Sequence, residues 1–225
     1  MSNRRYLLLH FIIKPAAVIA IGAWVTLATQ APAQTSNSAT TDTHKHEHHN
    51  HKPSLVDEAD VQARDLSDWE NNWQSIYPFL QDGTLDAVLA HKAEDGDKTV
   101  EEYRAYYNTG YTTEVERILI DGSSVTFFQD GKPTQGQYEN DGYEILTYES
   151  GNQGVRYVFE KSGGDEAAPQ FIQFSDHIMV PTKSDHYHLY WGDDRAKLLT
   201  EVTNWPTYFP ADLSGAEIAQ SMIAH

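Results

Sequence analysis

Residues 174–188 read FSDHIMVPTKSDHYH, which predicts two β-strands joined by a turn. The stretch contains three histidines, His177, His186 and His188. Residues two apart on a strand share a face, and so do residues opposed across an antiparallel pair. His186 and His188 therefore share a face, and His177 joins them if the numbers of opposed residues sum to an odd value. Sums of 363 or 365 place His177 directly opposite one of them, and a tight turn at Pro181–Ser184 allows such a register.

Three imidazoles on one face predict a metal site, because a His₃ set is an established zinc constellation. The chain has no cysteine, so any metal ligand is nitrogen or oxygen. The alternative is a hairpin whose surface or core histidines share no ligand. Asp176 and Asp185 flank two of the histidines and point to the opposite face, so we expect them to be turn or supporting groups.

Three protein ligands leave a fourth position open. Water, His225 or a histidine of the leader described below are the candidates for it. An open position also raises the alternative of a zinc hydrolase or hydratase, because zinc-bound water ionises near neutral pH. No second catalytic group is evident as a partner for that water, so we predict a protein that is not an enzyme.

The first 33 residues have the features of a cleaved export signal. Arg4 and Arg5 are followed by an apolar run at Ala16–Ala28 and a small-residue cleavage site at Ala31–Ala33. The run is shorter than the ~20 apolar residues of a membrane span. We therefore expect an exported, periplasmic protein with no membrane insertion after cleavage.

A polar leader, residues 34–53, follows the signal, and we expect it to be disordered. It carries a histidine-rich tract, which favours loose binding of divalent transition metals. A solvated tract with no specific role is the alternative. The histidines of the tract are His44, His46, His48, His49 and His51.

The remainder, residues 54–225, is predicted to be a single domain. Helical spacing and capping-box patterns favour a helical part at about 54–111, with helices near 67–80, 85–91 and 99–110. The period then changes to two, with turn dipeptides between short strands, up to about residue 191. The expected strands are 113–120, 123–129, 134–139, 143–149, 154–160, 170–178 and 186–191.

The C-terminal tail returns to a helical pattern, at 193–202 and from Ser214 to His225. The predicted fold is therefore α+β and mainly β: an antiparallel barrel at about 112–191, with an N-terminal helical part and a C-terminal helix. Such a barrel allows a further alternative, a carrier of a small apolar ligand.

With a formal charge of −17, the surface repels nucleic acid and anionic lipid, so we expect neither as a partner. Removing residues 1–33 takes away three basic residues (Arg4, Arg5 and Lys14) and no acid, which moves the charge from −17 to −20. There is no phosphate-binding glycine loop, no Gly-x-Ser-x-Gly elbow and no His-Glu-x-x-His motif. The three histidines are therefore the leading candidate for a functional site in the chain.

From Val56 to His225 the sequence resembles the ZinT (YodA) family of periplasmic metal-binding proteins. Residues 171–178 together with 186–188 are the most specific part of this resemblance. Shorter matching motifs are Leu66–Trp69, Trp73–Ser75, Gly142–Tyr143, Ile145–Tyr148, Gly154–Tyr157 and Asn204–Tyr208.

The resemblance implies a lipocalin-like (calycin) barrel with an added helical part. It implies zinc bound near the barrel mouth by His177, His186 and His188, with cadmium and other divalent ions also accepted. It further implies a role in zinc homeostasis and recruitment, alongside an ABC zinc importer and its periplasmic solute-binding protein.

Overall fold

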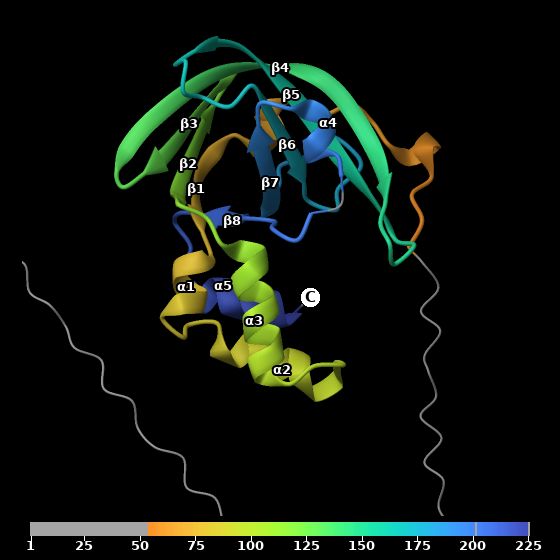
Figure 1. Cartoon of the computed structure of the whole chain (residues 1–225), viewed down its shortest axis with the longest axis vertical. Helices are drawn as coiled ribbons and strands as arrows, with labels where there is room; N and C mark the ends of the chain where they lie inside the picture. The colour runs from red at the N-terminus through yellow and green to blue at the C-terminus, as the bar shows by residue number, and fades with distance from the viewer. Residues whose placement is uncertain (1–53, 201, 225) are drawn as a thin grey trace, which may run out of the picture. The chain divides into compact units, whose positions relative to one another are not determined.

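The computed structural model describes residues 54–200 and 202–224. Within these residues eight strands form a closed antiparallel barrel in which each strand pairs with its neighbours in sequence and β1 pairs with β8. The predicted antiparallel barrel in an α+β chain is confirmed. Figure 1 shows helices α1, α2, α3 and α5 gathered at one end of the barrel, next to β8. The signal, the leader and His225 lie outside the described residues.

The strands are β1 (Asn71–Ser75), β2 (Val115–Asp121), β3 (Ser124–Gln129), β4 (Lys132–Thr147), β5 (Gln153–Gly164), β6 (Phe171–Ser175), β7 (Tyr187–Gly192) and β8 (Thr207–Pro210). The α-helices are α1 (Tyr77–Gln81), α2 (Asp86–Asp95), α3 (Val100–Tyr111), α4 (Arg195–Leu198) and α5 (Gly215–Ala224). Two 3₁₀ turns, η1 (Glu58–Asp60) and η2 (Leu66–Trp69), precede β1. No helix in the described part of the chain is long and apolar enough to cross a membrane.

The apolar side chains form two cores. Large aromatic side chains fill the barrel, and Trp69 stacks on Phe174 there with 4.6 Å between ring centroids. A second core joins α1, α2, α3 and α5 to Phe209 of β8. The packed aromatic interior stabilises a barrel that has no disulfide, since the chain has no cysteine.

The helix predicted near 67–80 is only partly confirmed, because η2 and the short α1 lie on either side of a strand, and the barrel extends beyond the predicted limits of 112–191. Residues 71–75 form β1, which hydrogen-bonds to β2 on one side and to β8 on the other. Trp73 is buried in the barrel, and its indole Nε1 donates to the carbonyl of Trp69 at 2.7 Å. The four-residue spacing of the two tryptophans resembles a helix, but closing the barrel requires a strand at this position.

Two glycine turns predicted between strands are also wrong. Asp141–Gly142 forms a bulge within the single long strand β4, where Gly142 has a φ of 86° and the register to β5 shifts. Residues 162–164 continue β5 instead of turning. A Cβ on Gly164 would lie 2.5 Å from the carbonyl oxygen of Gln135, so glycine permits close strand contact there.

The helix ends are partly as predicted. Capping boxes form at Thr99 with Glu102 and at Ser214 with Glu217. Helix α3 runs past the predicted stop at Gly110, where a Cβ would lie 2.3 Å from the ring of Trp205. Gly110 therefore serves helix packing. The helix expected at 193–202 is only the short α4.

Candidate metal centre

Strands β6 and β7 bring the predicted histidines to one end of the barrel. The ladder pairs Phe174 with Leu189 and Ser175 with His188, which is the odd register sum of 363. The ladder then ends, and residues 176–186 form a loop. The predicted tight turn at Pro181–Ser184 is therefore wrong. We call residues 176–186 the histidine loop.

His188 lies on β7 opposite Thr207 of β8. The Thr207 hydroxyl donates its one hydrogen to the carbonyl of Trp205 at 3.0 Å. It can therefore only accept from His188, whose Nδ1 is 2.8 Å away. This assignment leaves Nε2 of His188 with a free lone pair, the form of imidazole that binds a metal.

His186 is oriented by a carboxylate and an aromatic ring. Its Nδ1 lies 3.0 Å from Oδ1 of Asp185, and its ring stacks on Phe209 with 5.1 Å between centroids. A carboxylate on Nδ1 makes Nε2 the free nitrogen here as well. Asp185, expected on the face opposite the histidines, instead lies beside the ring of His186 and lines the same cavity, in a supporting position.

His177 reaches the cluster from the histidine loop in a left-handed conformation, with a φ of 64°. It follows the last paired residue of β6, so backbone conformation and not strand alternation directs its side chain. Its ring centroid is 5.8 Å from that of His188 and 6.4 Å from that of His186. The centroids of His186 and His188 are 6.2 Å apart. The structure brings all three histidines together.

The cluster is slightly too open to hold an ion as it stands. Zn–N bonds of about 2.0–2.1 Å at tetrahedral angles would bring ring centroids to roughly 5 Å. Within the described residues no three His, Asp or Glu side chains lie at metal-ligand spacing. Binding a metal therefore requires the three rings to approach one another by roughly 1 Å.

The surroundings of two of the imidazoles, those of His177 and His188, favour their neutral form. Protein atoms crowd the ring of the half-buried His188, and this desolvation, with smaller effects from His177, His186 and Arg156, lowers its pKa to about 3. His177 is more exposed, yet desolvation of its ring, and then His186, lower its pKa, while Asp176 opposes the shift. Neutral imidazoles are the form that binds a divalent ion.

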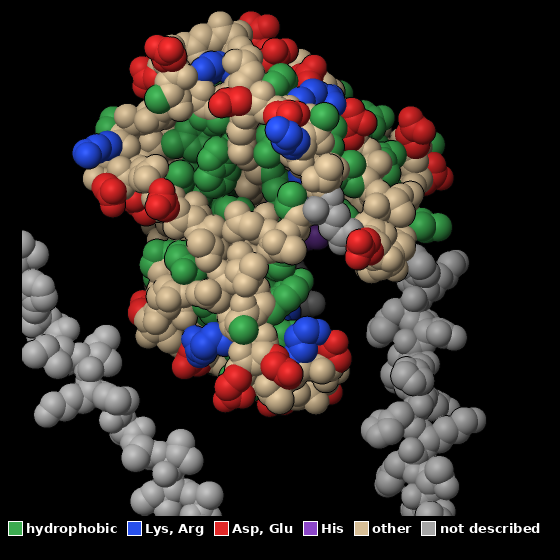
Figure 2. Space-filling view, viewed as in Figure 1, with side chains coloured by type: hydrophobic (Ala, Val, Ile, Leu, Met, Phe, Trp, Pro, Cys, Tyr) green, Lys and Arg blue, Asp and Glu red, His purple; other side chains and the backbone are tan. Residues whose placement is uncertain are grey.

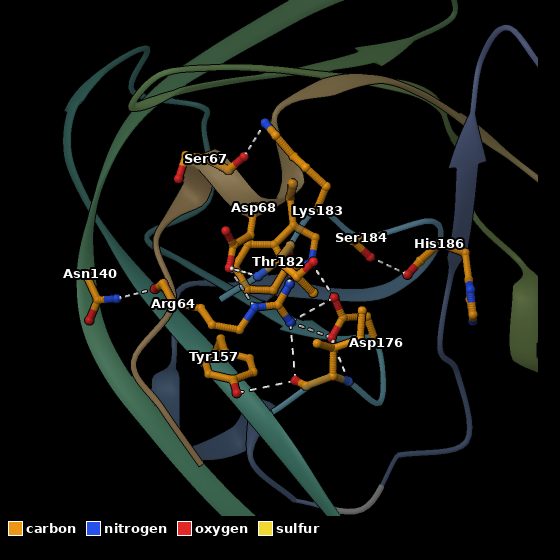
Figure 3. Close-up of polar contacts among 12 residues, drawn as sticks. Arg64, Ser67, Asp68, Asn140, Tyr157, Asp176, Thr182, Lys183, Ser184 and His186 are labelled. Carbon is orange, nitrogen blue, oxygen red and sulfur yellow. Dashed lines mark hydrogen bonds and ion pairs between the residues drawn. The ribbon is translucent and has the colours of Figure 1, made fainter. Parts of the chain in front are cut away.

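Arg64 fixes the histidine loop from the other side. Its side chain is fully buried, and its guanidinium contacts both oxygens of Asp176 at 2.7 and 2.9 Å (Figure 3). The same guanidinium donates to the carbonyls of Ile178 at 3.2 Å and Thr182 at 2.9 Å. It also lies 4.1 Å from the ring centroid of Trp69. One buried arginine therefore holds both ends of the segment that follows His177.

Further contacts join the loop to the segment before β1. Asp68 pairs with Arg64 at 2.8 Å and accepts from the backbone N–H of Thr182 at 3.2 Å. Trp69 Nε1 donates to Asp176 at 3.0 Å, and the phenol of Tyr157 donates to the carbonyl of Ile178 at 3.3 Å. We call Arg64, Asp68, Trp69, Tyr157 and Asp176 the loop anchor. Of these, sequence reasoning identified only Asp176 as a supporting group.

A cavity of about 410 Å³ adjoins the histidines. The barrel side contributes the three histidines, Thr207 and Phe209, and helices α2, α3 and α5 contribute the facing residues Lys92, Tyr107, Tyr111, Ser221 and Met222. Figure 2 shows histidine as a small purple area in the recess between the barrel and the helices. A metal at this site would therefore face a cavity and not bulk solvent alone.

One further histidine, His91, lies within the described residues, and it does not line the cavity. His91, predicted to be a surface residue, is exposed on α2 and lies 3.8 Å from Glu94. His225 and the histidine-rich tract fall outside the described residues. Their roles stay predictions.

Known proteins provide comparisons for this geometry. The model of the ZinT (YodA) periplasmic lipocalin-like zinc-recruitment family matches residues 47–225. The "Probable metal-binding protein YrpE" of Bacillus subtilis is 59% identical over 166 residues, which cover 73% of this chain and 66% of that protein. The "Zinc-binding protein AdcA" of Streptococcus pyogenes serotype M1 is 49% identical over 173 residues, which cover 75% of this chain. The chain spans only 34% of the length of AdcA.

A solved structure of the Zn(II)-bound ZinT-like domain of Streptococcus pneumoniae AdcA superposes with a TM-score of 0.73. The two share 45% identity, and the match covers 76% of this chain and 96% of that domain. The barrel and its helices are therefore a known arrangement.

Proposed function

Because the chain belongs to the ZinT (YodA) family of periplasmic lipocalin-like zinc-recruitment proteins, we propose that it binds Zn²⁺ through His177, His186 and His188. The observation that carries the proposal is the approach of three imidazoles to 5.8–6.4 Å between ring centroids. The Nδ1 atoms of two of them are occupied by Asp185 and Thr207, which directs their Nε2 atoms to the ion.

The chain would act by capture and transfer, not by catalysis. A hydrolytic site needs a free base beside the metal-bound water. Of the two carboxylates that line the cavity, Asp176 is committed to Arg64 and Trp69, and Asp185 is committed to His186. The packed aromatic interior argues likewise against an apolar ligand inside the barrel. Metal binding is the function that the described residues support best.

The wider role follows from the family and from the sequence. We propose that residues 1–33 are a cleaved signal peptide, that 34–53 are a metal-capturing leader and that 54–225 are the binding domain, in the periplasm. The protein would serve zinc homeostasis, accept Cd²⁺ as well, and pass zinc to the solute-binding protein of an ABC importer. His225 or a leader histidine would complete the coordination sphere whenever no other ligand does.

A zinc titration tests the site in a chain whose leader cannot bind metal. We define the leader-silent chain as the full chain with asparagine in place of His44, His46, His48, His49 and His51. It should bind one Zn²⁺ tightly, and His177→Ala, His186→Ala and His188→Ala in that background should each lose tight binding. His91→Ala, at an exposed histidine on α2, is the matched control and should bind as the parent does. If the three loop and strand variants keep the affinity of the parent, the assignment is wrong.

The full chain and the leader-silent chain together test the leader. Intact histidines should raise total metal capacity or speed loading, while one tight site remains in both proteins. Equal stoichiometry and equal loading rates would leave the leader without this role.

A further inference from the structure

The cavity beside the histidines has room for more than a metal-bound water. Its volume of about 410 Å³ falls within the roughly 300–1,000 Å³ usual for small-molecule sites. One water takes up only about 30 Å³ in the liquid. A metal held on the barrel side would therefore face space sufficient for a small organic ligand.

The charges around this space favour an anion. Three neutral imidazoles leave the two positive charges of a divalent ion uncompensated. Asp176 forms a buried pair with Arg64. Asp185 keeps its negative charge beside the neutral ring of His186, but its side chain is 75% exposed, so solvent screens it and it offsets only part of the metal charge. This local excess of positive charge lies in a chain whose formal charge is −17.

Lys92 adds to this charge from α2. It is the one Lys or Arg among the described residues that line the cavity. It forms no ion pair with another described residue, and its ammonium lies 6.0 Å from the ring centroid of Tyr107. Its charge is therefore available to a bound anion.

Two tyrosines of α3 provide hydrogen-bond donors on the helical side of the cavity, where Lys92 also lies. Neither the hydroxyl of Tyr107 nor that of Tyr111 has a hydrogen-bond partner within the described part of the chain, although Tyr111 is only 5% exposed. Burial raises the pKa of Tyr107 to about 12 and moves that of Tyr111 in the same direction. Both therefore remain protonated and can donate at neutral pH.

We infer that the cavity takes a small carboxylate together with the metal, as a ternary complex. One carboxylate oxygen would fill the fourth coordination position, and the rest of the ligand would lie between Lys92 and the two tyrosines. The protein would then receive or release zinc as a chelate of a small carboxylic acid. This inference rests on the proposed function, because the metal supplies one end of the ligand site.

Citrate added to the Co²⁺-loaded leader-silent chain tests the inference, since the visible spectrum of Co²⁺ reports its coordination. The spectrum should change saturably with citrate while cobalt stays with the protein through desalting. Lys92→Gln should weaken citrate binding about tenfold, because a charge-assisted contact is lost, and Lys92→Arg should recover most of it. Lys132→Gln, at an exposed lysine of β4 that does not line the cavity, should bind citrate as the parent does.

Other results would overturn the inference. The first is a Co²⁺ spectrum that citrate leaves unchanged, and the second is removal of the cobalt from the protein by citrate. The third is equal citrate affinity in the Lys92→Gln and Lys132→Gln variants. A fourth position closed by His225 would give the unchanged spectrum. Failure of the proposed function looks different, because the leader-silent chain would then not take up Co²⁺ or Zn²⁺ before citrate is added.

Discussion

The histidines of the candidate site are held in two different ways. His188 is paired on β7, and His186, the last residue of the histidine loop, directly precedes that strand; hydrogen bonds to Thr207 and Asp185 orient the two rings. We call these two histidines, with Asp185 and Thr207, the β7 side. His177 lies at the other end of the histidine loop, just after β6, where its ring has no such partner among the described residues and a buried ion pair holds the backbone instead. Strand pairing fixes side chains directly, whereas the loop depends on the loop anchor.

This difference indicates which part of the site adjusts on metal binding. The rings must approach by roughly 1 Å to share one ion. His188 is constrained by paired strands on both sides, and His186 directly precedes it with its ring against Asp185 and Phe209, so the movement is expected on the side of His177. The following predictions test whether the loop anchor and the β7 hydrogen bonds have separate roles.

Arg64→Ala should have the largest effect, because it leaves Asp176 buried without its partner. We expect a loss of about 3–5 kcal/mol in the free energy of unfolding. Zinc affinity should fall about 10- to 100-fold, as for other partners that orient metal ligands. Urea unfolding and zinc titration of the leader-silent chain provide the two measurements.

Two variants separate the role of Arg64 from a general loss of charge. Arg104→Ala removes a half-exposed arginine that pairs with Asp86 and donates to the Leu80 carbonyl, and it should cost about 1 kcal/mol, with zinc affinity retained. Arg64→Lys keeps the charge but not the planar fork, so it should fall between the parent and the alanine variant. An alanine variant that is destabilised yet binds zinc normally would show that the loop anchor does not position His177.

Thr207→Val tests the β7 side with nearly the same side-chain volume. Because the acceptor of His188 Nδ1–H is lost, zinc affinity should fall about 10- to 100-fold. Stability should fall by about 2 kcal/mol, because the hydrogen bonds to His188 and to the Trp205 carbonyl are both lost. Thr207→Ser keeps the hydroxyl and should retain the affinity, whereas equal affinity in the valine variant would mean that this bond does not orient His188.

Tyr157→Phe tests the loop anchor through alkaline pH. Burial raises the pKa of Tyr157 to about 12, with Arg64 opposing the shift and Asp176 adding to it. The unfolded chain releases its proton near pH 10, so this contribution to stability is complete below pH 10 and is lost as the pH rises through about 12. At pH 11 the loss should be about 1.4 kcal/mol.

The phenylalanine variant should lack that part of the alkaline loss. At pH 8 it should be only about 1 kcal/mol less stable than the parent, because the bond to the Ile178 carbonyl is gone. Urea unfolding at both pH values gives the comparison, and the other buried tyrosines contribute equally to both proteins. Parallel pH profiles would exclude Tyr157 as a titrating member of the loop anchor.

The same contrast explains what could be predicted from sequence. Strand alternation and an odd register bring His186, His188 and the region of His177 together, and the observed sum of 363 is among those predicted. The histidine loop could not be predicted, because its shape depends on Arg64, which lies 112 residues away from Asp176. Local patterns also misassigned β1, since Trp69 and Trp73 have helical spacing and only barrel closure makes residues 71–75 a strand.

Asp185→Asn should have the smallest effect on the β7 side. Asp185 contacts His186 as Thr207 contacts His188, but its side chain is 75% exposed. Solvent screens such a pair to about 0.2–1 kcal/mol, so zinc affinity should fall about fivefold at most. Glu101→Gln, an equal change of charge on the exposed first turn of α3, controls for the overall charge and should leave the affinity as it is.

Salt distinguishes the two hydrogen bonds of the β7 side. At 1 M NaCl the screening length is about 3 Å, so the difference between Asp185→Asn and the parent should nearly vanish. The loss in Thr207→Val should persist, because it comes from a neutral bond beside a crowded imidazole and not from an exposed charge. If both losses disappear in salt, the β7 side is held by electrostatics and its contrast with the loop anchor is smaller than the geometry indicates.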